Sequence, residues 1–210
     1  MKIDRLILGD FQTNCYILRV DPQAGDCIVI DTGLESGEMI DFLHDSKLYP
    51  IAVVLTHGHA DHIVGLAELR KHFPKTKVYI HKLDAEMLTN HRNNLSALTG
   101  RMFRTTPADT LLDDGDFIEQ AGIKLQVLHT PGHTPGGICL YCREEGIVFV
   151  GDTLFADSVG RTDFPGGSMT KLIESIAQNL LTLPDETVVY PGHGPFTTIG
   201  RERTHNQFLQ

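Results

Sequence analysis

Four side chains able to bind a metal ion lie within one short stretch, THGHADH at 56–62. Histidine nitrogens and carboxylate oxygens are common ligands of zinc and other transition metals. Only the small residues Gly58 and Ala60 separate the candidates, so ligand atoms are concentrated with little bulk between them. The candidates are His57, His59, Asp61 and His62.

Three more stretches carry candidate ligands, and each follows a hydrophobic run, as THGHADH follows IAVVLT. TPGHT contributes His133, GDT contributes Asp152 and PGHGP contributes His193. A position just past the carboxyl end of a buried strand is where α/β folds place their functional sites. We therefore expect the four stretches to meet in one site.

Five histidines and two carboxylates are too many ligands for a single ion. A zinc ion takes about four ligands, and a catalytic zinc takes about three from the protein. Two ions that share Asp152, with a water or hydroxide between them, accommodate the whole set. Because structural zinc usually recruits thiolate, a set without cysteine favours an open catalytic site. The other histidines are expected to be ordinary surface or core residues, with His129 at most supporting the site: His44, His72, His81, His91, His129 and His205.

Hydrophobic patterning predicts the elements that must position these ligands. Strand runs followed by helices, twice along the chain, indicate two sheets packed face to face with helices outside. MTKLIESIAQNLLTL at 169–183 has one apolar face at helical spacing. The polar segment 90–110 carries Arg92, Arg101 and Arg104 and is expected to be a disordered loop or a functional flap with one short helix. The predicted strands are 2–8, 15–20, 27–33, 51–56, 78–81, 116–120, 123–130, 138–142, 147–152 and 186–194, and the other predicted helices are 36–47, 63–73 and 83–89.

Length and composition are those of an ordinary globular protein, and we expect residues 1–210 to form one domain. The net charge of −9 gives no general attraction to nucleic acid. No secretory signal and no apolar run of membrane-spanning length is present, so we expect no membrane association and a cytoplasmic location. The cysteines are then expected to be free thiols, and Cys139 and Cys142 should lie on opposite faces of one strand.

The four motifs, in this order, resemble those of the metallo-β-lactamase superfamily. The match begins at IDTG, which starts at Ile30, and extends to the end of the chain. The resemblance implies an α/β fold, the four-layer αβ/βα sandwich, and a braced pair of metal sites. It implies that His57, His59 and His133 hold one ion, that Asp61, His62 and His193 hold the other, that Asp152 bridges the two, and that Asp31 braces the metal loops.

Within that superfamily, three further stretches are most similar to glyoxalase II, in its short bacterial hydroxyacylglutathione hydrolase form. They are NCYIL at 14–18, SVGRTDFPGGS at 158–168 and PGHGP at 191–195. Full-length glyoxalase II has a C-terminal helical domain that contributes to glutathione binding, and we expect no such domain here. True β-lactamases of the superfamily are secreted and usually lack the bridging carboxylate, so Asp152 favours a different hydrolase.

The resemblance implies hydrolysis of a small thioester such as S-D-lactoylglutathione, with Asp61 and Asp152 in catalytic positions. Two divalent ions are expected, zinc foremost, although iron and manganese also accept these ligands. A persulfide dioxygenase with one iron is the alternative, because such enzymes share the fold and the GRTDF motif. A metal-binding module without catalysis is a third possibility. The sequence leaves the oligomeric state open.

Two residues of the SVGRTDFPGGS segment are candidate substrate contacts. Arg161 could offer a bidentate fork to a substrate carboxylate, and Phe164 could form an apolar wall. Arg161 stands where the longer enzymes often have a lysine facing the substrate. The competing interpretation is that Arg161 pairs with Asp157 or Asp163 and only holds the loop in shape.

Overall fold

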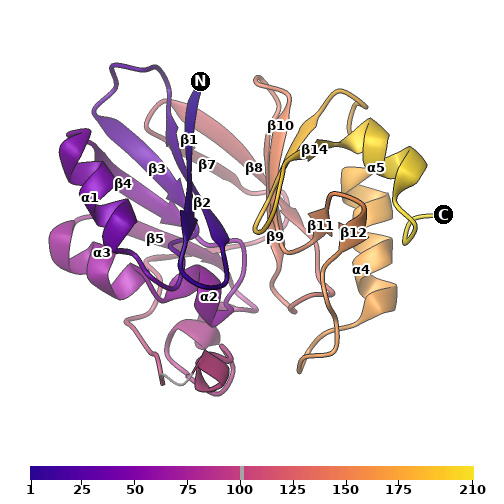
Figure 1. Cartoon of the computed structure of the whole chain (residues 1–210), viewed down its shortest axis with the longest axis horizontal. Helices are drawn as coiled ribbons and strands as arrows, with labels where there is room; N and C mark the ends of the chain where they lie inside the picture. Colours follow the sequence, from indigo (N-terminus) through magenta and orange to yellow (C-terminus); the bar gives the residue numbers. More distant parts are fainter. Residues whose placement is uncertain (100–101) are drawn as a thin grey trace.

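The computed structural model describes residues 1–99 and 102–210, which are arranged in four layers (Figure 1). Two six-stranded sheets pack face to face. Helices α1 and α3 cover the outer face of the first sheet, and α4 and α5 cover the outer face of the second (Figure 1). The αβ/βα sandwich predicted from the sequence is therefore confirmed.

The first sheet gathers the strands of the amino-terminal half. β1, β2 and β3 are antiparallel neighbours, whereas β3, β4, β5 and β6 run parallel to one another. Because β4 is an interior strand, THGHADH leaves the sheet between its neighbours at their carboxyl ends. The strands, in spatial order, are β1 (Lys2–Leu8), β2 (Thr13–Arg19), β3 (Asp26–Ile30), β4 (Tyr49–Val54), β5 (Lys77–His81) and β6 (Thr110–Leu112).

The second sheet has the spatial order β14-β13-β10-β9-β8-β7. β10 and β13 are parallel, and β8 runs the same way because β9 is antiparallel to both β8 and β10. The segments after β8, β10 and β13 therefore leave the sheet at the same end, and three of the four ligand-bearing motifs lie there. The strands are β7 (Phe117–Gln120), β8 (Ile123–His129), β9 (Ile138–Cys142), β10 (Ile147–Gly151), β13 (Val188–Pro191) and β14 (Thr197–Thr198); a separate pair is formed by β11 (Leu154–Phe155) and β12 (Ser158–Val159).

Helices and helical turns occupy the outer layers and the loops. The α-helices are α1 (Gly37–Asp45), α2 (Ala60–Ile63), α3 (Leu66–His72), α4 (Met169–Ser175) and α5 (Ile199–His205). Two 3₁₀ turns, Ala85–Leu88 and Ser96–Thr99, follow β5, and a π-helical turn, Ile176–Leu180, continues α4. Among residues 1–99 and 102–210, no helix is both long and apolar enough to cross a membrane.

Strict alternation along the central strands divides the core into three apolar layers. In β10, Val148 and Val150 face the α4 layer, whereas Ile147 and Phe149 face the other sheet. Cys139 and Cys142 obey the same rule, since Cys139 belongs to the α4 layer and Cys142 to the layer between the sheets. All four cysteines are free and buried, as expected.

Several predicted elements differ in detail from the structure. The predicted helix 83–89 is only a 3₁₀ turn, and the helix predicted at 63–73 is divided between α2 and α3. The helix predicted at 169–183 changes to π geometry at Ile176 and ends before Pro184, which cannot extend it. Four strands were missed because they carry too few residues for periodicity to register: β6, β11, β12 and β14. Helix α5 was missed because its sequence, IGRERTH, contains one large apolar residue, Ile199, and so shows no apolar face.

The described residues of the segment 90–110 are mostly irregular but are anchored to the fold. Asn94 is buried, and its amide nitrogen donates to the carbonyl oxygens of Met87 and Phe103. The backbone nitrogen of Ala60, beside the ligand motif, donates to the carbonyl oxygen of Asn94. The expected short helix corresponds to the 3₁₀ turn Ser96–Thr99, and Arg101 lies outside the described residues.

Phe149 provides a test of the core between the sheets. It is fully buried, and its ring centroid lies 5.2 Å from those of both Tyr16 and Tyr190. We predict that Phe149→Ala lowers the free energy of unfolding by about 3–5 kcal/mol, because it removes buried contacts and leaves a cavity. Urea unfolding of metal-free protein measures the change. The exposed Phe196 is the matched control, and Phe196→Ala should cost less than about 0.5 kcal/mol. Equal losses in both variants would contradict this account of the core.

Candidate metal centre

All seven sequence-predicted ligands meet at the edge where the two sheets place their ligand-bearing loops. The first loop, between β4 and α3, carries four of them, and the other three follow β8, β10 and β13. The ligand atoms fall into three groups whose members lie within 4.8 Å of one another. The groups are His57, His59 and His133; His57, His62 and Asp152; and Asp61, His62 and His193.

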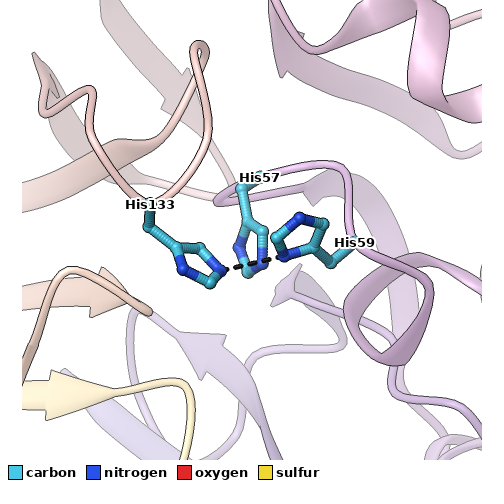
Figure 2. Close-up of side chains that lie close together, drawn as sticks. All are labelled: His57, His59 and His133. Atoms are coloured by element: carbon cyan, nitrogen blue, oxygen red, sulfur yellow. Dashed lines mark hydrogen bonds between the residues drawn. The ribbon is translucent and has the colours of Figure 1, made fainter. Parts of the chain in front are cut away.

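The first group consists of three buried imidazoles from two loops. Figure 2 shows the rings of His57, His59 and His133 converging, with a dashed line between the closest pair of nitrogens. His59 Nδ1 lies 2.9 Å from His133 Nε2. The other ring nitrogen of His133, Nδ1, donates to the carbonyl oxygen of Arg161 at 2.7 Å, which fixes the tautomer that turns Nε2 toward the group.

We call His57, His59 and His133 the first ligand group and Asp61, His62 and His193 the second, while His57, His62 and Asp152 lie where the two meet. The second group combines two imidazoles with a carboxylate. His62 Nε2 lies 3.2 Å from His193 Nε2, and His193 Nε2 lies 3.2 Å from an oxygen of Asp61. Asp152 lies between the groups, because its Oδ2 is 3.5 Å from His193 Nε2 and 3.6 Å from His133 Nε2, and its Oδ1 is 3.4 Å from His62 Nε2. Its position is that of a ligand able to serve both groups.

Opposite pKa shifts distinguish the two groups. Burial, reinforced by neighbouring histidines, lowers the pKa of His57 well below its ordinary value and that of His59 to about 3, which leaves both neutral. Burial also opposes charge on His62 and His193, but the surrounding carboxylates, Asp152 and Asp61 foremost, together outweigh it, raising the pKa of His62 well above its ordinary value and that of His193 to about 9. Burial would raise the pKa of Asp152, yet these two histidines hold it well below its usual range.

The donor set fits divalent transition-metal ions. Two nitrogens bound to one tetrahedral ion at about 2.0–2.1 Å would lie about 3.3 Å apart, close to the separations of 2.9 and 3.2 Å between ligand nitrogens here. His57 Nε2 is buried and has no hydrogen-bond partner among the described residues. A buried nitrogen left unpaired is costly, and an ion at the first group would satisfy it.

Asp31, at the end of β3, occupies the bracing position expected for it. Its carboxylate accepts hydrogen bonds from the backbone nitrogen of Thr56 at 2.8 Å and from the Thr56 hydroxyl at 2.7 Å. It also lies 2.8 Å from His62 Nδ1. Asp31 therefore fixes the start of the first ligand loop and directs His62 Nε2 toward the second group.

A second buried carboxylate, Asp84, joins two ligand loops, and sequence reasoning missed it. One of its oxygens accepts from the backbone nitrogen of Gly58 at 3.1 Å and from the Thr134 hydroxyl at 2.7 Å. The other accepts from the backbone nitrogen of Gly136 at 2.6 Å. Burial raises the pKa of Asp84, and these three hydrogen bonds oppose that effect. Nothing in the local pattern HKLDAEM distinguished this aspartate from a surface residue.

The loop that carries His193 is held from the amino-terminal hairpin. The side-chain nitrogen of Asn14 donates to the carbonyl oxygens of Pro191 and Gly194, and the Tyr16 hydroxyl donates to Pro191 as well. Gly192, between Pro191 and Gly194, must be a glycine because a Cβ at this position would collide with Asp152 and His62. The NCYIL motif therefore has a structural role, which is to hold the last ligand loop against Asp152.

His129 does not join the candidate centre. Its ring stacks on that of His81, with centroids 4.1 Å apart, and its Nε2 lies 2.9 Å from the carbonyl oxygen of Pro135. This hydrogen bond to the loop that carries His133 reaches a backbone atom and not a ligand side chain. The remaining histidines outside the seven are absent from the candidate ligand groups among the described residues.

A cavity of about 480 Å³ opens beside both ligand groups. Arg161 and Phe164, the candidate substrate contacts, both line it. In this structure the guanidinium of Arg161 pairs with Asp163 through two hydrogen bonds of 2.7 Å, which is the competing arrangement considered for it. The alternative partner, Asp157, pairs with Arg201 instead.

Comparison with known proteins identifies the family. The model of the metallo-β-lactamase superfamily matches residues 8–193. Over the whole chain, the protein is 37% identical to the probable metallo-hydrolase YqgX of Bacillus subtilis and 34% identical to the hydroxyacylglutathione hydrolase GloC of Haemophilus influenzae, and each match covers 98% of the relative. The chain therefore belongs to the metallo-β-lactamase superfamily.

Solved structures support the same assignment. The crystal structure of the BLEG-1 B3 metallo-β-lactamase is 40% identical, with a TM-score of 0.94 over 100% of both chains. The structure of TTHA1623 in a di-iron-bound form is 36% identical, with a TM-score of 0.86 over 98% of this chain and 100% of that one. Family and site together define the class of this protein, a metal-dependent hydrolase.

Asp84 allows the loop geometry to be tested separately from the ligands. We predict that Asp84→Asn weakens metal affinity roughly 10- to 100-fold, because one of its oxygens can no longer accept from the ligand loops. Competition with a chromophoric chelator measures the change. The exposed Asp113 provides the matched control, and Asp113→Asn should retain the parental affinity. A folded Asp84→Asn protein with unchanged metal affinity would show that the hydrogen bonds accepted by Asp84 are dispensable for metal binding.

Proposed function

We propose that this protein hydrolyses a small thioester, with S-D-lactoylglutathione as the reference substrate, at a centre of two divalent ions. The observation that carries the proposal is the position of Asp152 between two complete ligand groups. The hydroxyacylglutathione hydrolase GloC, similar along the whole chain, supports the reaction class. Residues 1–210 would carry this activity as one domain.

In this proposal, His57, His59 and His133 hold one ion, Asp61, His62 and His193 hold the other, and Asp152 binds both. Ions so held would supply Lewis acidity and an activated water. The di-iron form of TTHA1623 supports a pair of ions, whereas zinc remains our first choice for a tetrahedral nitrogen and oxygen set.

The side chains around the centre bind and orient rather than form covalent bonds. Asp61 and Asp152 border the cavity and would contact the reacting atoms, with Asp61 able to take a proton from the attacking water. The backbone oxygen of Arg161 orients His133, and Asp31 orients His62. The thiol formed from the leaving group has a pKa of about 8.5, so it departs as a thiolate without help from a strong general acid. A thioester substrate therefore needs no general acid beyond the residues named here.

Hydrolysis of a β-lactam is a second candidate function. The likeness to the BLEG-1 B3 metallo-β-lactamase along the whole chain favours it. Both reactions add water to an acyl carbon, and they differ in the group that leaves. The Asp152 carboxylate shared between the ligand groups is our reason for placing the thioester first.

Metal content tests the centre. Protein purified without chelator should contain about two transition-metal ions per chain. Asp152→Ala removes a ligand from both groups, so metal content should fall and the hydrolysis rate should drop by roughly 100-fold or more. Elemental analysis and steady-state kinetics measure the two effects, and the exposed Asp41 provides the control Asp41→Ala. A metal-replete parent that holds a single iron would favour the persulfide dioxygenase alternative.

Oxygen dependence separates hydrolysis from oxidation. We expect S-D-lactoylglutathione or a related 2-hydroxyacyl thioester to be cleaved at equal rates in air and under anaerobic conditions, because water is the only co-reactant. Thiol release and oxygen uptake are recorded together, with glutathione persulfide and a cephalosporin as parallel substrates. Oxygen uptake with the persulfide and no thiol release would replace the proposal by the dioxygenase, and cephalosporin turnover alone would replace it by β-lactam hydrolysis.

A further inference from the structure

Apolar side chains form most of the cavity wall beyond the ligand groups. They come from four separate segments: the β1–β2 turn, the irregular segment after β5, the β11–β12 pair, and the loop before α4. Several of these side chains retain solvent exposure, and Phe11 is 51% exposed. The apolar residues concerned are Phe11, Leu95, Phe155, Val159 and Phe164.

These walls stand on both sides of the candidate centre. The ring of Phe164 meets that of His59 edge to face, with centroids 5.8 Å apart, at the first ligand group. The ring of Phe155 lies 6.3 Å from that of His193 at the second group. Phe11 is tied to the same histidine, because its carbonyl oxygen accepts from His193 Nδ1 at 3.0 Å. A substrate whose carbonyl lies between the groups would thus have an aromatic wall on either side.

Positive charge is scarce in this wall. Arg161 is the one lysine or arginine among the described residues that line the cavity. Its guanidinium makes two hydrogen bonds to Asp163 and lies over the Phe164 ring, 4.0 Å from the ring centroid. A ligand carboxylate would have to displace Asp163, within a chain whose net charge is −9. The bidentate pair therefore neutralises the charge that could otherwise select an anionic substrate.

The geometry points to thioesters with apolar acyl groups and uncharged thiol parts as the preferred substrates of this centre. The inference rests on the proposed thioester hydrolysis and adds the chemical class of its substrate. Glutathione carries two carboxylates and an ammonium group. Among the described residues of the wall, no unpaired lysine or arginine is present to bind those carboxylates. Apolar groups, in contrast, gain binding free energy in proportion to the area that the walls remove from water.

Matched thioesters test the preference. The same acyl group, acetyl or phenylacetyl, is attached to glutathione or to neutral N-acetylcysteamine, and kcat/KM is measured for all four compounds. We expect the phenylacetyl ester of N-acetylcysteamine to exceed the acetyl ester of glutathione by roughly 10-fold or more. Equal values for all four compounds, or a preference for both glutathione esters, would overturn the inference while leaving thioester hydrolysis intact. Cleavage of S-D-lactoylglutathione with none of the four cleaved would also overturn the inference, whereas no cleavage of any of these five compounds would refute the proposed function itself.

Substitutions of the aromatic wall residues test which side chains cause the substrate preference. Phe155→Ala and Phe164→Ala should each lower kcat/KM for the phenylacetyl ester roughly 5- to 50-fold, with metal content unchanged, and Phe164→Leu should restore most of the loss. Phe196, an exposed aromatic outside this cavity, provides the control Phe196→Ala. If the alanine variants lose activity equally on all four esters, the rings act on the centre and not on substrate selection, and the inference fails.

The ion pair between Arg161 and Asp163 provides an independent test of the inference. Asp163→Asn releases the Arg161 guanidinium, so cleavage of the glutathione esters should rise several-fold while that of the N-acetylcysteamine esters stays constant. A selective loss of glutathione esters in Arg161→Ala would show that the arginine already binds a carboxylate, against the inference.

Discussion

Two buried carboxylates hold the ligand loops of this protein in place, and the candidate centre depends on them. Asp31 ties the start of the first loop to His62, and Asp84 ties the same loop to the one that carries His133. Each accepts hydrogen bonds from backbone or hydroxyl groups that burial would otherwise leave unpaired. The loops can therefore present several polar ligand atoms to one another without an extensive regular structure of their own.

The packing of the sheets determines which loops can meet. Tyr16 of the first sheet packs on Phe149 and Tyr190 of the second, and its hydroxyl also bonds the loop that precedes His193. One side chain thus joins the core between the sheets to the site at their edge. A change in the separation of the sheets would move the ligand groups relative to each other, which explains why an ordinary apolar core matters for the chemistry.

The electrostatic design separates the centre from its surroundings. Around Asp152, imidazoles and carboxylates compensate one another. Burial and neighbouring histidines lower the pKa of His57, whereas hydrogen bonds to Asp152 and Asp61 together outweigh burial and raise that of His193. Beyond the ligand groups the wall is apolar, and the guanidinium of Arg161 is already paired. The reaction class we propose follows from the ligand groups, whereas the substrate class we infer follows from this wall.

Local pattern was enough to determine the long strands, the motif THGHADH and the strand-end positions of His133, Asp152 and His193, because periodicity and turn residues act over a few positions. It also indicated the four-layer architecture. The partners of those residues were decided only by the tertiary structure. Asp84 and Asn14 contact loops 50 and 177 residues away in sequence, and no local signal encodes such hydrogen bonds. The partner of Arg161 was left open for a related reason, since Asp157 and Asp163 were both candidates until the loop conformation selected Asp163.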